Sequence, residues 1–379
     1  MPTQRVGSDG RDKVRRAEDW RQSGANSTVS VPDTPAYHGI DAFVHVARAL
    51  SAECAPGDLR VWGLDHEAAY RQLPVANPDH TFVILNTPSG PTLWRHNVLM
   101  FGSTASVWGY CRVADLMSWL DRCLLLIPML HFVDDFGGVD SSNLAQSAFE
   151  CSQRVCGALG LKFKLSKAQP PKRAHKLQGV YLQLGETEAT VAMTPERAQR
   201  LDNQLKQVIL DNKLSPKEAS SLAGKLQFVT QSLFGRASAA ALRPLYRRAH
   251  SAHFRSSKGG WQLSESIMAA LDFLRRRLRE SKPRVVRYVV EERAIIYADA
   301  FFEIGGRRYR PAEAEEIPCW GRTAPASFIN GWGFVACVSG KTVFAELPSH
   351  QLLFVDNEPA RHALTKGFTN DANMNKLLQ

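Results

Sequence analysis

The chain has 379 residues, of which 44% are hydrophobic and 22% charged, and these proportions exclude a collagenous or fully disordered protein. Its most apolar run, residues 123–130, is far shorter than the roughly 18 residues needed to span a bilayer. Seven cysteines without a C-x-x-C pair indicate neither a disulfide framework nor a zinc module. We therefore expect an intracellular protein, in the nucleus or cytoplasm, without a membrane partner.

The net charge of +10 is concentrated in one stretch of the chain. Residues 243–310 hold 16 Lys and Arg against 7 Asp and Glu. A block of this kind suits a polyanion, because each phosphate contact releases counterions and strengthens binding. The alternative is a solvated helix face, which a charge run by itself favours. Chemistry directed at nucleic acid elsewhere in the chain would decide between the two.

In chain order, a basic and partly disordered segment at 1–30 precedes a region that predicts an α+β domain. Helical spacing of apolar residues indicates helices at 36–50, 107–120 and 144–159. Short apolar stretches predict strands at 59–64, 81–85, 92–99 and 129–133. Helices set against a mostly antiparallel sheet are typical of the α+β class.

Residues 194–250 predict a small helical bundle. Thr194 and Ser215 each precede a proline, as N-cap residues often do, and Glu218 completes a capping box with Ser215. A basic helical stretch around residues 275–279 follows. A second α/β segment opens near Val285, with expected strands at 295–300 and 351–358.

Acidic residues stand at two predicted strand ends. Asp65 closes an apolar strand five residues before Tyr70, and Asp134 and Asp135 stand at the tip of a predicted hairpin over 131–139. Asp is common in turns, so the Asp134-Asp135 pair by itself has a plain structural explanation. Together, the two sites could supply the carboxylates that nucleotidyl transfer needs, which converge from separate strands on two Mg²⁺ ions roughly 3.5–4 Å apart.

These motifs, in this order and at these spacings, resemble the reverse transcriptases of retrotransposons, especially the tyrosine-recombinase type related to long-terminal-repeat elements. Asp65 with Tyr70 resembles the first palm motif, and residues 132–135 (Phe-Val-Asp-Asp) resemble the aromatic-x-Asp-Asp box. Four further segments are similar to motifs of the family. Residues 14–26 resemble the fingers motif, and residues 101–106 resemble the motif that cradles template and nucleotide. Residues 160–167 resemble the later palm motif with its lysine, and residues 177–179 resemble the primer grip.

The resemblance implies an RNA-directed DNA polymerase with a right-hand architecture. It implies a fingers segment at 1–30, a fingers and palm domain at 31–190, a helical thumb at 191–250 and a basic connection at 251–290. The implied partners are RNA and DNA template-primer and deoxynucleoside triphosphates. The alternatives are a catalytically decayed remnant that binds nucleic acid without synthesis and a nucleic-acid-binding scaffold unrelated to polymerases.

The resemblance also assigns roles residue by residue. Asp65 and Asp134 would ligate two Mg²⁺ ions with Asp135 as a supporting acid, and Lys167 would protonate the departing pyrophosphate. The nucleotide would meet four further residues: Arg15 at its triphosphate, Tyr70 as a steric gate against a ribose 2′-hydroxyl, and Gly102 and Ser103. The plain alternatives are a core aromatic for Tyr70, a solvated lysine for Lys167 and a basic tail residue for Arg15.

Residues 291–379 resemble a ribonuclease H-like domain that is truncated. Asp299 and Asp356 each follow an apolar stretch and would form a vestigial metal site. The family has a helix with a catalytic glutamate before the second of these strands, whereas here residues 342–350 leave too little chain for it and hold a single acid, Glu346. We therefore expect this domain to lack nuclease activity.

Overall fold

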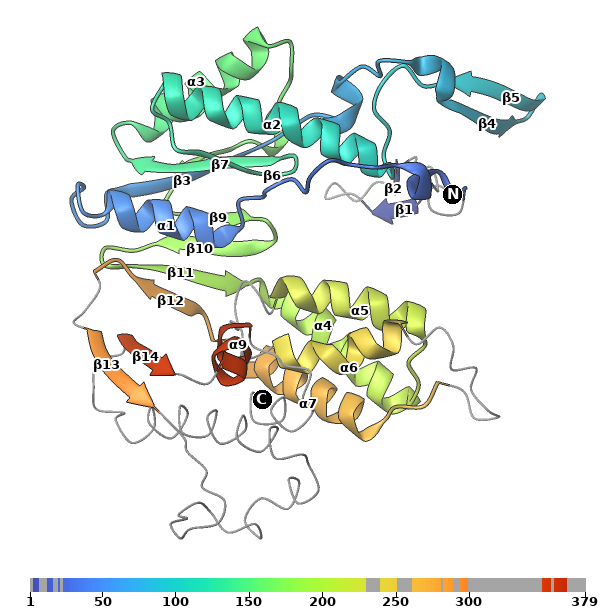
Figure 1. The fold of residues 1–379 in the computed structure, drawn as a ribbon. Helices are drawn as coiled ribbons and strands as arrows, with labels where there is room; N and C mark the ends of the chain where they lie inside the picture. Colours follow the sequence, from blue (N-terminus) through green and yellow to red (C-terminus); the bar gives the residue numbers. More distant parts are fainter. Residues whose placement is uncertain are drawn as a thin grey trace. The chain divides into compact units, whose positions relative to one another are not determined.

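The computed structural model describes residues 3–6, 12–15, 20, 23–229, 239–250, 261–280, 282–289, 293–298, 350–355 and 358–366. The chain divides into two units. One comprises residues 1–178 with 182–189, and the other comprises residues 179–181 with 190–379. Both units combine helices with strands, which confirms the mixed α+β class (Figure 1). No helix among the described residues is both long and apolar enough to cross a lipid bilayer.

A four-stranded sheet forms the centre of the first unit. Its order is β6 (Met129–Phe132), β7 (Asp135–Ser141), β3 (Leu59–Asp65) and β8 (Gln169–Lys172). β3 runs antiparallel to both of its neighbours, and β6 and β7 form the predicted hairpin. The strands predicted at 59–64 and 129–133 are therefore confirmed. β3 is a central, mostly buried strand, and Asp65 is its last residue.

Helices cover both faces of this sheet. α2 (Thr104–Leu124) and α3 (Ala145–Ala158) lie on one face, and α1 (Ile40–Leu50) lies on the other (Figure 1). Trp62 on β3 packs edge-on against Phe149 on α3, with ring centroids 5.9 Å apart. A Cβ at Gly138 on β7 would lie 2.6 Å from the Trp62 ring, so a glycine at this position leaves room for the indole.

Several predicted element ends differ from the structure by a few residues. The helix expected at 107–120 is longer at both ends, since α2 spans Thr104–Leu124. The first helix begins at Ile40 rather than near residue 36, because Gly39 is extended and the amide of His38 donates to the carbonyl of His131 (2.9 Å). The strand expected at 92–99 ends at Arg95, where the hairpin of β4 (Phe82–Thr87) and β5 (Gly90–Arg95) ends. Near the N-terminus, β1 (Thr3–Val6) and β2 (Asp12–Arg15) form an antiparallel pair.

A second four-stranded sheet has the order β12 (Arg284–Arg287), β11 (Glu188–Met193), β10 (Val180–Leu184) and β9 (Ala174–Leu177). β9 and β10 are joined by a two-residue turn, Gln178 and Gly179, in which both φ angles are positive (48° and 79°). Its turn lies in the segment 177–179, which resembles the primer grip in sequence. The predicted helices of the bundle follow it.

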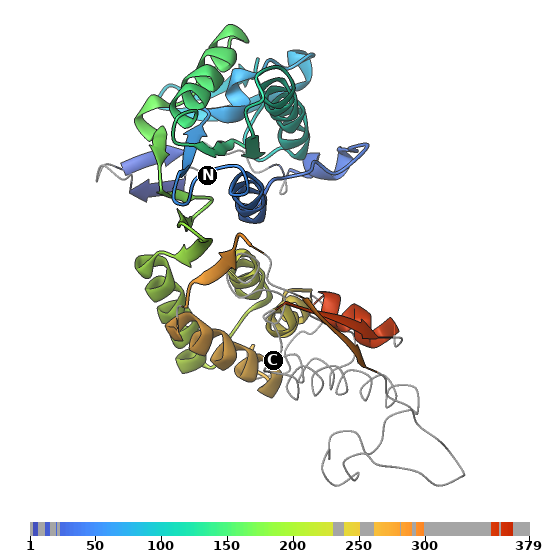
Figure 2. The same cartoon turned by 90° about the vertical axis from the view of Figure 1, so that its left-hand side faces the viewer.

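The helical bundle of the second unit consists of α4 (Pro195–Asp211), α5 (Pro216–Val229), α6 (Ala239–His250) and α7 (Glu265–Glu280). The capping box at the start of α5 is confirmed, since the Ser215 amide donates to Glu218 Oε2 (2.9 Å) and the Glu218 amide to Ser215 Oγ (3.3 Å). α4 and α7 lie side by side (Figure 2) and are joined by an ion pair from Arg275 Nε to Asp202 Oδ1 (2.9 Å).

Near the C-terminus, β13 (Arg293–Ala298) pairs in parallel with β14 (His350–Val355), and α9 (Glu358–Lys366) follows. Both predicted strands are thereby confirmed, although β14 ends before residue 358. Asp299, Asp356 and Glu346 lie outside the described residues.

Candidate active site

The register of the central sheet brings the acidic motifs together. Asp65, the last residue of β3, is paired directly with Asp135, the first residue of β7. Asp135 is also paired with Phe132, which leaves Val133 and Asp134 as a two-residue turn. The amide of His66 donates to the carbonyl of Asp134 (3.2 Å), so the turn is anchored to the residue that follows Asp65. Three acids from two distant segments thus share one end of the sheet.

The turn that carries Asp134 has an unusual backbone. Val133 adopts a φ of 55°, in the left-handed region that β-branched residues rarely occupy. Two-residue hairpins need positive φ values and usually place Asn or Gly there. Backbone strain of this kind persists where the surrounding structure imposes it, and it concentrates at functional sites.

The charges at this end of the sheet are strongly coupled. Desolvation, followed by the neighbouring charges of Asp134 and Asp65, raises the pKa of Asp135 to about 6, and Lys167 opposes this increase. Nζ of Lys167 forms an ion pair with Oδ2 of Asp65. Lys167 stands in a short 3₁₀ turn (Leu165–Lys167), and the Lys164 amide just before this turn donates to the carbonyl of Asp65 (2.7 Å).

A small pocket of about 110 Å³ opens beside the acids. Asp65 and Asp135 line it, whereas Asp134, on the turn, is not part of its described lining. The lining also includes Gln178, from the segment 177–179 that resembles the primer grip, and two polar residues that no sequence motif singled out, Gln169 and Lys176. Their signal in the sequence is weak, because polar residues that alternate along strands are also expected at any solvent-facing edge.

Tyr70 lies close to the acids. It stands in a 3₁₀ turn (Ala69–Gln72) and is half-buried, with its ring centroid 5.1 Å from Phe101 and 5.2 Å from Tyr110. Desolvation raises its pKa to about 12, and the charge of Asp134 is the next largest cause. The hydroxyl therefore stays protonated at neutral pH.

The segment proposed to cradle the nucleotide is held by a residue of the N-terminal motif. Asn26 donates from Nδ2 to the carbonyl of Gly102 (2.9 Å), and its Oδ1 accepts from the amide of Thr104 (3.0 Å). Gly102 has a φ of 94°, and buried Ser103 precedes the first residue of α2. Arg15 lies in β2, but its side chain is outside the described part of the structure.

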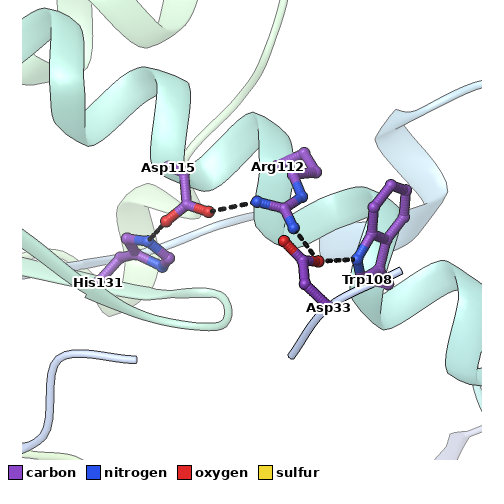
Figure 3. A network of polar contacts seen from close by, with 5 residues as sticks. All are labelled: Asp33, Trp108, Arg112, Asp115 and His131. Atoms are coloured by element: carbon purple, nitrogen blue, oxygen red, sulfur yellow. Dashed lines mark hydrogen bonds and ion pairs between the residues drawn. The ribbon is translucent and has the colours of Figure 1, made fainter. Parts of the chain in front are cut away.

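Figure 3 shows a polar network that joins α2 to β6 and to the segment before α1. The carboxylate of Asp33 accepts from Trp108 Nε1 (2.8 Å) and from the Arg112 guanidinium, and these hydrogen bonds lower its pKa. Arg112 Nη1 also lies 4.0 Å from Asp115 Oδ2, and Asp115 Oδ1 lies 2.9 Å from Nε2 of buried His131. The network thus anchors the strand that enters the acidic turn.

The carboxylates at this site suit a Mg²⁺ ion whose remaining ligands come from phosphate and water. Within the described ranges, no group of three or more His, Cys, Asp or Glu side chains is arranged to enclose a metal. Mg²⁺ in phosphoryl-transfer sites is usually held by one or two carboxylates, with phosphates and water completing the octahedron. Asp65 and Asp135 are oxygen donors. Burial, together with the neighbouring charges of Asp134 and Asp65, raises the pKa of Asp135, and a bound cation would offset this cost of ionising its carboxyl.

No protein-family model matches the sequence, and no match was found among curated proteins. Solved structures with a similar fold include two of the foamy viral protease-reverse transcriptase, in complex with double-stranded DNA. For the dRH form, the TM-score is 0.51 at 13% identity, over 99% of this chain and 62% of that chain. For the other, the values are 0.50 and 14%, over 93% and 68%.

The chain thus spans 62% of the length of the first of these structures. At such low identity the likeness shows the fold alone. The chain has a reverse transcriptase-like fold.

Proposed function

We propose that the chain is an RNA-directed DNA polymerase of a retroelement, which adds deoxynucleotides to a primer 3′ end with two Mg²⁺ ions. The observation that carries the proposal is the pairing of Asp65 with Asp135 across β3 and β7, with Asp134 on the adjoining turn. Acids that repel one another beside a pocket reduce the stability of the fold. Such an arrangement is typical of functional sites, and bound cations would offset the repulsion.

Asp65, Asp134 and Asp135 would hold the two Mg²⁺ ions. When bound, such ions supply charge stabilisation for the transferring phosphoryl group and lower the pKa of the attacking hydroxyl. The side chains around them have separate tasks. Lys167 carries a proton on Nζ next to Asp65, where it could pass to the leaving pyrophosphate. Arg15 would meet the triphosphate.

Tyr70 would form the wall beneath the sugar of the incoming nucleotide. Its ring is held by Phe101 and Tyr110, and its hydroxyl stays protonated near the acids. A wall in that position would exclude a ribose 2′-hydroxyl by a steric clash. Gly102 and Ser103, fixed through Asn26, would line the nucleotide from the α2 side.

The template-primer would bind to basic residues of the second unit. Its affinity would depend strongly on salt, because phosphate contacts release counterions. Part of the basic excess has a different role, since Arg275 and Arg279 pair with Asp202, and Arg248 donates to the carbonyls of Leu214 and Gln262. The foamy viral structures, which have a similar fold, hold double-stranded DNA, and this supports a duplex as the ligand.

Primer extension by the purified chain on RNA and DNA templates with Mg²⁺ tests the proposal. We expect extension that is lost in Asp134→Asn, with primer–template affinity nearly unchanged. Asp79→Asn is the control, because Asp79 is an exposed acid whose partner is Arg95 on the β4–β5 hairpin. Duplex binding without extension by the unaltered chain would favour the decayed remnant instead.

A further inference from the structure

His66 follows Asp65 directly and has no role in the proposed chemistry, yet its side chain is buried and both ring nitrogens have a partner. It is 3% exposed, and it lies where β3, α2, α3 and the segment before Lys167 meet. We propose that His66 is the positioning residue that holds the acids and Lys167 in one arrangement. This inference rests on the proposed function for its catalytic consequence.

The main chain of His66 links the functional segments. Its amide donates to the carbonyl of Asp134 (3.2 Å), which ties the acidic turn to β3. An isolated antiparallel bridge pairs His66 with Phe163, and on either side of that bridge the Lys164 amide donates to Asp65 (2.7 Å) and the Glu67 amide to Lys162 (2.9 Å). A shift of His66 along the sheet would therefore displace the turn and the approach to Lys167 together.

The side chain of His66 fixes that backbone against both helices. Nδ1 lies 2.6 Å from the hydroxyl of Tyr110 on α2, and Nε2 lies 3.4 Å from Sγ of Cys156 on α3. The ring also packs against Phe136 and Phe163, with centroids 4.7 and 4.5 Å away. Two directional bonds at opposite ends of a planar ring leave it one orientation, which packing by itself would not specify.

Phe136, the residue after Asp135, is held from a second side as well. The ring of His131 stacks on it with centroids 5.6 Å apart and an interplanar angle of 28°. His131 is in turn bound to Asp115 in the network of Figure 3. The start of β7 therefore lies between two buried imidazoles, and His66 is the one that also contacts the turn through its main chain.

An apolar residue would fill the same space without needing polar partners, because a buried polar group gains stability only when its hydrogen bonds are made. Packing is thus a poor reason for an imidazole here. The geometry instead suits a residue that transmits the positions of α2 and α3 to the ends of β3 and β7. Tyr110 is the partner through which this can be tested with the smallest change of volume.

The test compares Tyr110→Phe with Ser118→Ala, which removes another buried hydroxyl about two turns further along α2. In Tyr110→Phe we expect kcat for primer extension to fall about tenfold with KM for primer–template unchanged. We also expect hydrogen exchange at the His66 amide, measured by NMR, to become about tenfold faster. Ser118→Ala should change the melting temperature without either effect.

Two outcomes would overturn the proposal: unchanged exchange at His66 in Tyr110→Phe, or equal effects of both variants on exchange and kcat. His66→Gln, which retains a donor and an acceptor, should keep more activity than His66→Leu. If these two variants fail to fold, the result for Tyr110→Phe decides whether His66 is a positioning residue. Should the unaltered chain show no extension, the proposed function fails, whereas the exchange measurement still decides whether His66 holds the turn.

Discussion

Lys167 forms an ion pair with Asp65, from which it is separated by 102 positions in the sequence. The side chain of Asp65 is 15% exposed and that of Lys167 46%, so the ion pair is partly open to solvent. A cation that binds Asp65 must therefore share it with, or take it from, the ammonium group.

Lys167→Gln should accordingly affect cation binding and catalysis in opposite directions. Loss of the competing charge should strengthen Mn²⁺ binding about fivefold, which is about 1 kcal/mol and typical of a partly exposed pair. Loss of the proton on Nζ should lower kcat for extension by at least about tenfold. Titration calorimetry and single-turnover extension measure the two, with exposed Lys162→Gln as control. If Mn²⁺ affinity is unchanged, the ion pair does not restrict the site.

Tyr70→Ala separates a steric gate from a core aromatic. A gate that is lost should admit ribonucleotides, so their incorporation should rise relative to deoxyribonucleotides while the fold survives. Because Tyr70 is half-buried, the loss of stability should be about 2 kcal/mol, below the roughly 3–5 kcal/mol for a fully buried ring. Incorporation efficiencies and the melting temperature of one variant distinguish the two, and Tyr70→Phe, which keeps the ring, should retain selectivity. Unchanged sugar preference with a large loss of stability would remove the gate.

Asp121→Asn should change how stability depends on pH. The Asp121 side chain is fully buried on α2, and burial raises its pKa from 3.8 to about 6, although the Ser152 hydroxyl opposes the increase. The folded state therefore binds the proton more tightly than the unfolded state. Its stability falls as the pH rises from about 4 to about 6, and the cost is complete above that range.

The Asn variant should remove this cost. We expect it to be more stable than the unaltered chain by about 3 kcal/mol at pH 8, with little difference near pH 4. Urea unfolding at both pH values measures the effect, and Glu150→Gln, an exposed acid on α3, is the control. An equal gain at both pH values would mean that the change acts through packing and not through the proton.

The C-terminal segment should not cleave RNA. β13 and β14 pair in parallel up to Ala298 and Val355, directly before Asp299 and Asp356 in the sequence. Two acids are fewer than the four that the resemblance to ribonuclease H-like domains implies for a nuclease site. An RNA–DNA hybrid incubated with the chain and Mg²⁺ should therefore show no strand-specific RNA cleavage. Cleavage that disappears in Asp356→Asn would contradict this and would imply that Glu346 or another acid completes the site.

Local patterns in the sequence were sufficient for the secondary structure that surrounds the candidate site. The acidic hairpin was predicted from apolar residues followed by Asp134-Asp135 and two glycines, and the start of α5 from Ser215 and Glu218. Such signals are short-range, because caps, turns and strand alternation depend on residues within about four positions. Where a distant partner competed, as at His38, the predicted boundary was wrong by a few residues.

The arrangement of side chains depended on tertiary structure. The pairing of Asp65 with Asp135 follows from the register of β3 on β7, and the ion pair with Lys167 from the return of a segment about 100 residues later. His66 is an ordinary polar residue in the sequence, and only the packing of α2 and α3 gives it two partners. Residue types and their order therefore determined which chemistry the chain could carry. Register and packing, which depend on contacts across the whole domain, decided which of those groups meet.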